Sequence, residues 1–124
     1  MGKEPMHKVL VVDDEAPILE LLTYNLKKTG YEVMTAVNGL EALEVAKKFL
    51  PDLVLLDIMM PVMDGYEMLR QLKDDSVLKD IPVIAVTARA RIGDDMKCMQ
   101  AGASDYIPKP IDLNIFVTKM AKWL

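Results

Sequence analysis

Carboxylates, a hydroxyl and an ammonium each follow a short apolar run in this sequence. The runs and the polar residues after them are Val9–Val12 with Asp13, Asp14 and Glu15; Leu53–Leu56 with Asp57; Val83–Val86 with Thr87; and Tyr106–Ile107 with Lys109 and Pro110. Short apolar runs without strict alternation are typical of strands buried on both faces. Each polar group is therefore expected at the end of a buried strand.

These residue types together fit the chemistry of a phosphoryl group held beside a metal ion. Crowded carboxylates repel one another, and a few oxygen ligands with room for water suit Mg²⁺, with Mn²⁺ as the alternative ion. The Lys109 ammonium can neutralise phosphoryl oxygens, and the Thr87 hydroxyl can donate a hydrogen bond to another. Asp57 would then be the nucleophile that accepts the phosphoryl group.

The segments between the runs have the apolar spacing of helices. A fifth, more alternating run is Glu32–Ala36. The apolar helical positions are Ile18, Leu21, Leu22 and Leu26 in one stripe; Leu40, Leu43 and Ala46; and Met68, Leu69 and Leu72. The last helix is expected to present Ile115, Phe116, Met120 and Trp123 or Leu124 inward. A fourth helix is expected from about Ile92 to Gln100. The order is a strand and a helix repeated five times, which predicts a doubly wound parallel α/β sheet. In such sheets ligands bind outside the carboxyl ends of the strands, where these polar residues fall.

Length and composition narrow the class of protein. The chain has 124 residues and a formal net charge of −4, which fits one domain and disfavours direct nucleic-acid binding. No apolar run is long enough to cross a bilayer, and Cys98 is the only cysteine, so a cytoplasmic protein without a membrane segment is expected. Residues 1–7 are predicted to be a flexible N-terminal tail, and residues 8–124 the folded domain.

The combined motifs resemble the receiver domains of two-component response regulators. They are Val-Val-Asp13-Asp14-Glu15, Leu-Leu-Asp57-Ile-Met-Met-Pro61, Asp64-Gly65, Val-Thr87-Ala88 and Lys109-Pro110. The resemblance covers about residues 8–124 and implies a flavodoxin-like fold with strand order 2-1-3-4-5. It implies that Asp14 and Asp57 bind Mg²⁺ directly, that Asp13 acts mostly through water, and that the Met59 backbone carbonyl completes the metal shell.

The same resemblance implies the function and its partners. Asp57 is the expected phosphorylation site, with Thr87 and Lys109 binding the phosphoryl group and Tyr106 as the aromatic switch residue. The Lys109–Pro110 peptide is expected to be cis, which aims the lysine into the site. The phosphoryl donor would be a sensor histidine kinase or a histidine phosphotransfer protein. A downstream protein, or a second copy of the chain, would bind the surface of the fourth helix, fifth strand and fifth helix. The domain would catalyse only its own phosphorylation and dephosphorylation.

Three other functions share part of this pattern. An FMN-binding protein of similar fold needs a hydroxyl- and glycine-rich phosphate loop after the first strand, where this chain has three acids. An aspartate-nucleophile phosphatase usually has a second Asp two positions after the first, where this chain has Met59. A pseudo-receiver that binds partners by shape alone is expected to lack a site residue, and none is lacking here. A titration with beryllofluoride and Mg²⁺ separates all three from a receiver.

The lifetime of the phosphorylated state should depend on Met59 and Arg89. By the resemblance, these are the side chains placed to orient the water that hydrolyses the acyl phosphate. Met59 offers only a weak thioether acceptor, and Arg89 has donors but no acceptor to take a proton. Losing one water-orienting hydrogen bond of about 1.4 kcal/mol slows a step roughly tenfold, so we expect a half-life of many minutes or longer.

The combined change Met59→Asn and Arg89→Glu should therefore speed phosphate release by about tenfold or more. Release of inorganic phosphate from the phosphorylated protein measures the rate. A double variant that keeps its phosphoryl group as long as the starting protein would contradict this account.

Overall fold

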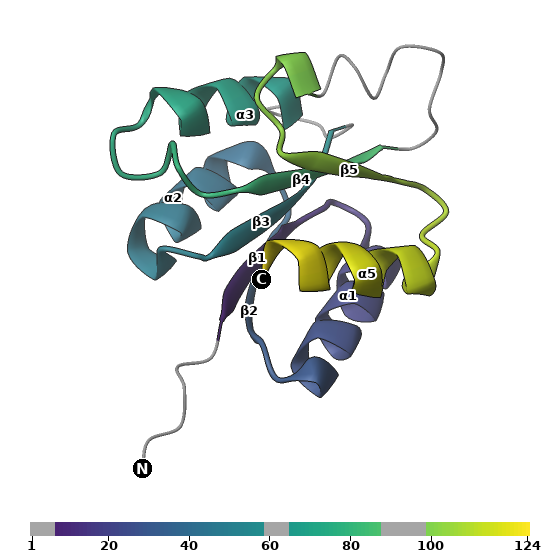
Figure 1. Cartoon of the computed structure of the whole chain (residues 1–124). Coiled ribbons are helices and arrows are strands. Elements are labelled where there is room, and N and C mark those ends of the chain that lie inside the picture. Colours follow the sequence, from purple (N-terminus) through teal and green to yellow (C-terminus); the bar gives the residue numbers. More distant parts are fainter. Residues whose placement is uncertain (1–6, 59–64, 88–98) are drawn as a thin grey trace.

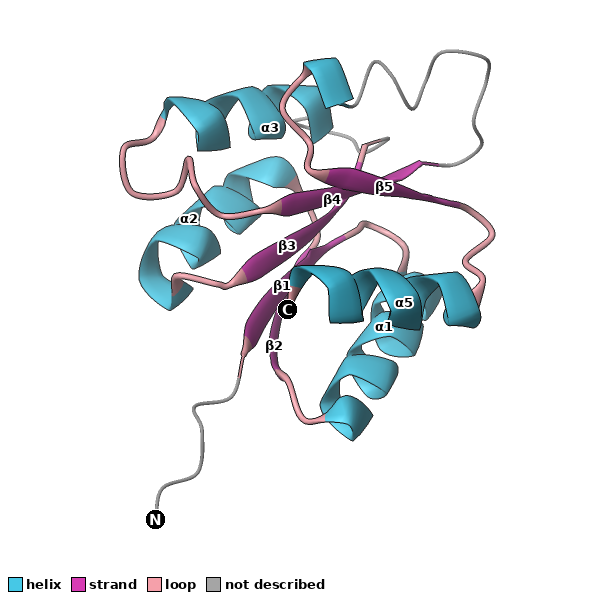
Figure 2. Ribbon diagram, viewed as in Figure 1, coloured by secondary structure: helices cyan, strands magenta, loops and turns pink. Residues whose placement is uncertain are grey.

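Five parallel strands form the centre of the molecule. In a computed structural model of the chain, which describes residues 7–58, 65–87 and 99–124, they build one sheet with helices on both faces (Figures 1 and 2). The strands are β1 (Lys8–Val12), β2 (Glu32–Ala36), β3 (Leu53–Asp57), β4 (Val83–Thr87) and β5 (Asp105–Pro108). Their order is β2-β1-β3-β4-β5 and every pairing is parallel, which confirms the predicted fold class and strand order.

Four helices are described in full, and they occupy the segments that the sequence predicted. They are α1 (Ala16–Thr29), α2 (Gly39–Phe49), α3 (Gly65–Asp74) and α5 (Leu113–Trp123). The fourth predicted helix, from about Ile92 to Gln100, falls mostly outside the described residues. Its last two positions, Met99 and Gln100, are helical, and Gly102 follows with a φ of 113°. A left-handed glycine of this kind is a common way to end a helix.

Local side chains and glycines set the helix ends. Asn38 Oδ1 accepts a hydrogen bond from the Glu41 amide at 2.9 Å and so caps α2. Asp112 caps α5 in the same way. Gly30, with a φ of 106°, ends α1 in the left-handed conformation that glycine adopts without steric cost. These caps explain why the breaks between periodic segments were readable from the sequence.

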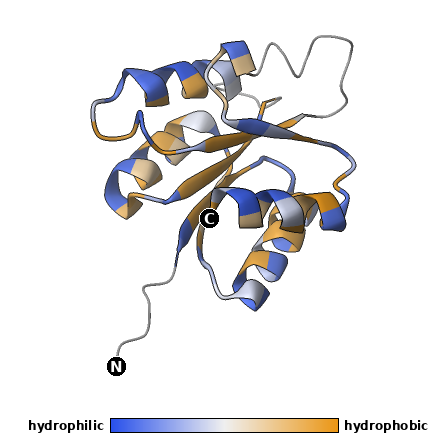
Figure 3. Ribbon diagram, in the orientation of Figure 1, coloured by the Kyte–Doolittle hydropathy of each residue, from blue (hydrophilic) through white to orange (hydrophobic). Residues whose placement is uncertain are grey.

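The core consists of two layers, one on each face of the sheet. Residues of β1 and β3 alternate between them, so both central strands are buried on both sides (Figure 3). The first layer packs under α2 and α3 and includes Ala42, Ala46, Met68, Leu69 and Leu72. The second packs under α1 and α5 and includes Leu22, Leu26, Phe116 and Met120. The strand ends that bear the polar residues are therefore held between two apolar layers.

Three apolar positions of the predicted helices are exposed, among them Ile115, which was predicted to face inward. Leu21 is 37% exposed, Leu40 is 53% exposed and Ile115 is 41% exposed. In α2 the buried face consists of Gly39, Ala42 and Ala46, because small residues let a helix approach the sheet closely. The spacing predicted the helices correctly, but packing against the sheet selected which neighbouring apolar row faces inward.

A buried carboxylate fastens α5 to β5. Asp105 accepts hydrogen bonds from Lys119 Nζ at 2.5 Å, from Trp123 Nε1 at 3.0 Å and from the Tyr106 amide at 2.8 Å. Burial raises the pKa of Asp105, but these three hydrogen bonds outweigh it and hold the pKa below its usual value. Asp105 therefore stays ionised at neutral pH and couples the start of β5 to the second half of α5.

The predicted N-terminal tail, residues 1–7, falls mostly outside the described residues. His7, its last residue, accepts a backbone hydrogen bond from the Glu32 amide at 2.9 Å. Within the described part of the chain, no helix has the length and apolar character that a membrane crossing requires.

Candidate functional site

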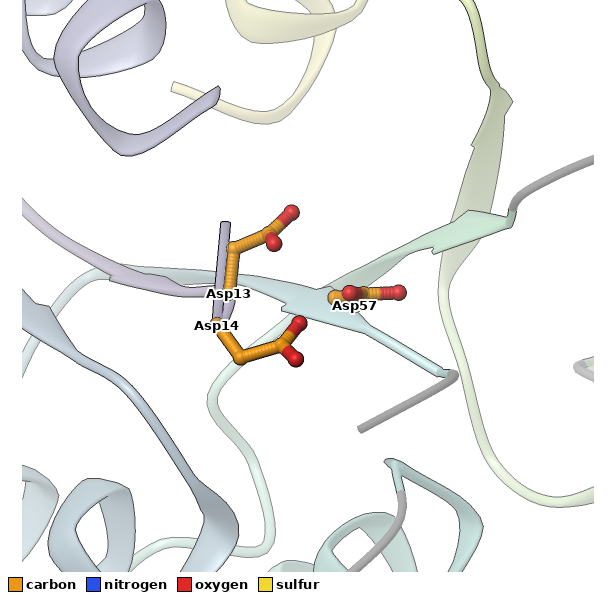
Figure 4. Close-up of side chains that lie close together, drawn as sticks. All are labelled: Asp13, Asp14 and Asp57. Atoms are coloured by element: carbon orange, nitrogen blue, oxygen red, sulfur yellow. The ribbon is translucent and has the colours of Figure 1, made fainter. Parts of the chain in front are cut away.

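Three carboxylates converge at the carboxyl ends of β1 and β3. Asp13 and Asp14 follow β1, and Asp57 is the last residue of β3 (Figure 4). Each of the three has a carboxylate oxygen within 4.8 Å of such an oxygen on the other two. Asp13 and Asp57 are only 2% exposed, whereas Asp14 is exposed. The sheet thus brings together acids that are far apart in the sequence, and leaves one side of the cluster open to water.

Among the described residues, Lys109 is the cation that faces this cluster. Its Nζ lies 3.1 Å from Asp13 Oδ2, 3.4 Å from Asp57 Oδ2 and 3.5 Å from Glu15 Oε2. Burial lowers the pKa of the lysine, but the hydrogen bond to Asp13 and the charges of Asp57, Asp13 and Glu15 outweigh it and raise the pKa. Lys109 is therefore firmly charged, and it is shared between three carboxylates.

Asp13 has both carboxylate oxygens engaged within the protein. Its Oδ1 accepts a hydrogen bond from the Glu15 amide at 2.9 Å, and its Oδ2 faces Lys109. Asp14, by contrast, faces solvent. The expected division of roles, in which Asp14 binds a metal directly and Asp13 acts mostly through water, stays a prediction.

The remaining site residues lie on β4 and β5 or outside the described residues. Thr87 ends β4, and its backbone pairs with Pro108, next to Lys109, although its side chain is among the parts not described. The Lys109–Pro110 peptide is cis. Tyr106 is half-buried against the core layer under α2 and α3. Met59 and Arg89, the residues expected to tune the lifetime, lie outside the described residues.

Sequence reasoning missed two features of this region. Glu15 was given no role at the site beyond its place in the acidic motif, yet its carboxylate contacts Lys109 directly. Asp105 received no role, although it anchors Lys119 beneath the expected output surface. The sequence does hold a signal for this contact. Lys119 and Lys122 lie one helical turn apart, so both can face Asp105 at the start of the preceding strand.

The donor set of the cluster fits a small, hard divalent cation. Its members offer only carboxylate oxygens, which suit Mg²⁺ and Mn²⁺, and the exposed side at Asp14 leaves room for the water ligands that Mg²⁺ retains. Among the described residues, the Lys109 ammonium contacts Asp13, Glu15 and Asp57, so one positive charge faces these three carboxylates and the nearby Asp14. The cluster can therefore hold a metal ion.

Comparison with known proteins identifies the family. The sequence matches the response regulator receiver domain over residues 9–121, inside the predicted domain 8–124. It is 41% identical to the polar-differentiation response regulator DivK of Brucella anthropi over 116 residues, which cover 94% of each protein. It is 47% identical to the response regulator PleD of Caulobacter vibrioides over 105 residues, covering 85% of this chain and 23% of PleD. The chain thus spans less than a quarter of that longer relative.

Solved structures agree with this relationship. The receiver domain of the sensor histidine kinase PA1611 from Pseudomonas aeruginosa superposes with a TM-score of 0.87 at 30% identity, covering 96% of this chain and 98% of that one. The family match, the shared strand order and the acidic cluster at the carboxyl edge of the sheet lead to one conclusion: the chain belongs to the receiver domains of two-component response regulators.

Proposed function

We propose that this domain is a signalling switch that accepts a phosphoryl group on Asp57 in the presence of Mg²⁺. The observation that supports this most directly is the position of Asp57. It is buried at the end of β3, its Oδ2 lies 3.4 Å from Lys109 Nζ, and it shares the cluster of Asp13 and Asp14. An acceptor carboxylate beside a fixed ammonium is suited to phosphoryl transfer, because the transferred group is rich in negative charge.

In the proposed reaction a carboxylate oxygen of Asp57 attacks the phosphorus of a phosphohistidine. The new P–O bond forms as the P–N bond breaks, and the electron pair of that bond returns to the imidazole nitrogen. Lys109 neutralises a phosphoryl oxygen, and the Thr87 hydroxyl donates to another. In a separate hydrolysis step, water attacks the phosphorus, the P–O bond to Asp57 breaks, and inorganic phosphate leaves as the Asp57 carboxylate is regenerated. The domain thereby promotes its own phosphorylation and dephosphorylation and transforms no other substrate.

Asp13, Asp14 and Asp57 would hold the metal ion in this proposal, with the Met59 backbone carbonyl as a further ligand. When bound, Mg²⁺ supplies positive charge that stabilises the phosphoryl oxygens during transfer. The solved PA1611 receiver domain, which has a magnesium ion coordinated in its active-site cleft, supports the choice of ion. The phosphoryl donor would be a sensor histidine kinase or a histidine phosphotransfer protein, and the transfer would take place in the cytoplasm.

Output would pass through β5 and α5 together with the fourth predicted helix. Tyr106 on β5 lies beneath Lys119 of α5, whose Nζ is 5.1 Å from the centre of the tyrosine ring and also pairs with Asp105. If phosphorylation draws Thr87 toward the phosphoryl group, Tyr106 turns inward and leaves Lys119 without its aromatic neighbour. That is a local repacking with two states, biased by charge at Asp57, and it would alter the surface offered to a downstream protein or a second copy of the chain.

The acceptor role predicts a covalent adduct at one residue. Incubation with acetyl phosphate and Mg²⁺ should add the mass of one phosphoryl group to the intact protein, and Asp57→Asn should abolish the gain. The exposed variant Asp80→Asn is the control and should be modified like the starting protein. An adduct that persists in Asp57→Asn, or that forms equally well in EDTA, would show that the assignment is wrong.

The acidic cluster predicts that Mg²⁺ stabilises the folded protein. At about 100 times the dissociation constant, the metal should raise the free energy of unfolding by roughly 2.7 kcal/mol. Asp14→Ala should weaken Mg²⁺ binding and raise the melting temperature of the metal-free protein, because one repelling carboxylate is gone. Asp80→Ala should respond to Mg²⁺ like the starting protein. A melting curve unmoved by millimolar Mg²⁺ would rule out the metal site.

The switch predicts a response at Trp123, the only tryptophan. Its indole N–H donates to Asp105, so it senses any rearrangement of Lys119 and Tyr106. Beryllofluoride with Mg²⁺ should shift the indole resonance and the amides of β5 and α5 in ¹⁵N spectra, and Asp57→Asn should remove the response. Changes confined to the immediate neighbours of Asp57 would argue against the switch.

A further inference from the structure

Gly65, the first residue of α3, packs directly against the backbone of the acceptor strand. Its amide donates a hydrogen bond of 2.9 Å to the carbonyl oxygen of Ile58, the residue after Asp57. A Cβ atom built at position 65 would lie 2.5 Å from Ile58 Cα, 2.8 Å from the carbonyl oxygen of Asp57 and 2.8 Å from Ile58 Cδ1. The start of α3 therefore touches the peptide that joins Asp57 to Ile58.

Glycine is needed at this position because there is no room for a side chain, and not because the backbone has a positive φ. Among the described glycines, Gly30 and Gly102 have positive φ, whereas Gly65 does not. Helix propensity alone would favour Ala at position 65. Two of the three crowded atoms belong to the backbone and cannot rotate away, so a methyl group must push the Asp57–Ile58 peptide or the first turn of α3 aside.

We propose that Gly65 is a positioning residue for the acceptor site. Its missing side chain lets α3 lock the end of β3, so that the Asp57 carboxylate stays in reach of Asp14 and Lys109. This inference rests on the proposed function, because it concerns the metal and phosphoryl site built around Asp57. Metal ligands tolerate only small displacements, and loss of an outer support typically costs 10–100-fold in metal affinity.

The test compares Gly65→Ala with a matched glycine variant, Gly30→Ala. A Cβ atom at position 30 meets nothing within 4 Å, but the backbone φ of 106° there is strained for Ala. Gly30→Ala therefore lowers the stability of the fold at a place far from the site. Isothermal titration with Mg²⁺ should give a dissociation constant at least about tenfold higher for Gly65→Ala, and one within about twofold of the starting protein for Gly30→Ala. In metal-free ¹⁵N spectra, the Asp57 and Ile58 amides should shift only in Gly65→Ala.

A double variant separates backbone crowding from side-chain crowding. Ile58→Val removes the Cδ1 atom but leaves the two backbone contacts, so Gly65→Ala with Ile58→Val should still bind Mg²⁺ weakly. Recovery of the starting affinity in this double variant would overturn the proposal, since the methyl group would then act through the side chain alone. Equal Mg²⁺ affinity in Gly65→Ala and the starting protein, or equal loss in Gly30→Ala, would overturn it as well.

The experiment also distinguishes failure of this inference from failure of the proposed function. If the starting protein does not bind Mg²⁺, both the proposed function and the role of Gly65 are wrong. If it binds Mg²⁺ and Gly65→Ala binds equally well, only the role of Gly65 is wrong. If Gly65→Ala does not fold, amide hydrogen exchange in the starting protein tests the role of Gly65 instead. The Gly65 amide should then be as protected as the amides of β3, and exchange at the rate of an open amide would overturn the proposal.

Discussion

Repulsion between carboxylates gathered at one sheet edge is the constraint on which this molecule depends. Asp13, Asp14 and Asp57 have oxygens within 4.8 Å of one another, and two of the three are buried. At such separations each pair of charges costs on the order of a few kcal/mol when water is partly excluded. Lys109 offsets part of this cost but is shared between Asp13, Asp57 and Glu15. In the proposed function, the negative charge of this cluster would attract a cation, and the bound cation would in turn allow a phosphoryl group to approach.

The packing of the rest of the fold offsets the destabilisation that this repulsion causes. The acids follow β1 and end β3, two interior strands of the sheet whose residues are buried in both core layers. Because these strands cannot shift without exposing apolar surface, the carboxylates cannot move apart to relieve their repulsion. The Glu15 amide just ahead of α1 helps by donating to Asp13, so the backbone also contributes to stabilising the charge.

The site is continuous with the face through which a signal would leave. β4 and β5 pair side by side, so that Thr87 lies opposite Pro108 and Tyr106 lies opposite Ala85. Asp105, at the start of β5, holds Lys119 and Trp123 of α5. Asp105 pairs with Ile84 of β4, so β4 is joined to α5 through β5. In the proposed function, a change at Asp57 would reach the surface of α5 through this pair of strands.

The sequence alone determined the order of the elements and the residues that stand at the strand ends. Short apolar runs, the caps at Asn38 and Asp112 and the glycine after α1 are local signals, and local chemistry sets strand and helix boundaries. The acidic, hydroxyl and lysine residues of the candidate site were likewise recognisable, since they depend on residue type and on a resemblance that covers about residues 8–124.

Only the tertiary structure decided how helices face the sheet and how charges are shared. Leu40 points outward and Ala42 inward because the sheet selects the side of α2 that fits closest, a choice that helical spacing leaves open. The contact of Lys109 with Glu15, the burial of Asp105 beneath α5 and the approach of Gly65 to Ile58 each join segments that are separate in sequence. Distances of this kind arise from the packing of whole elements, and no local pattern of residues specifies them.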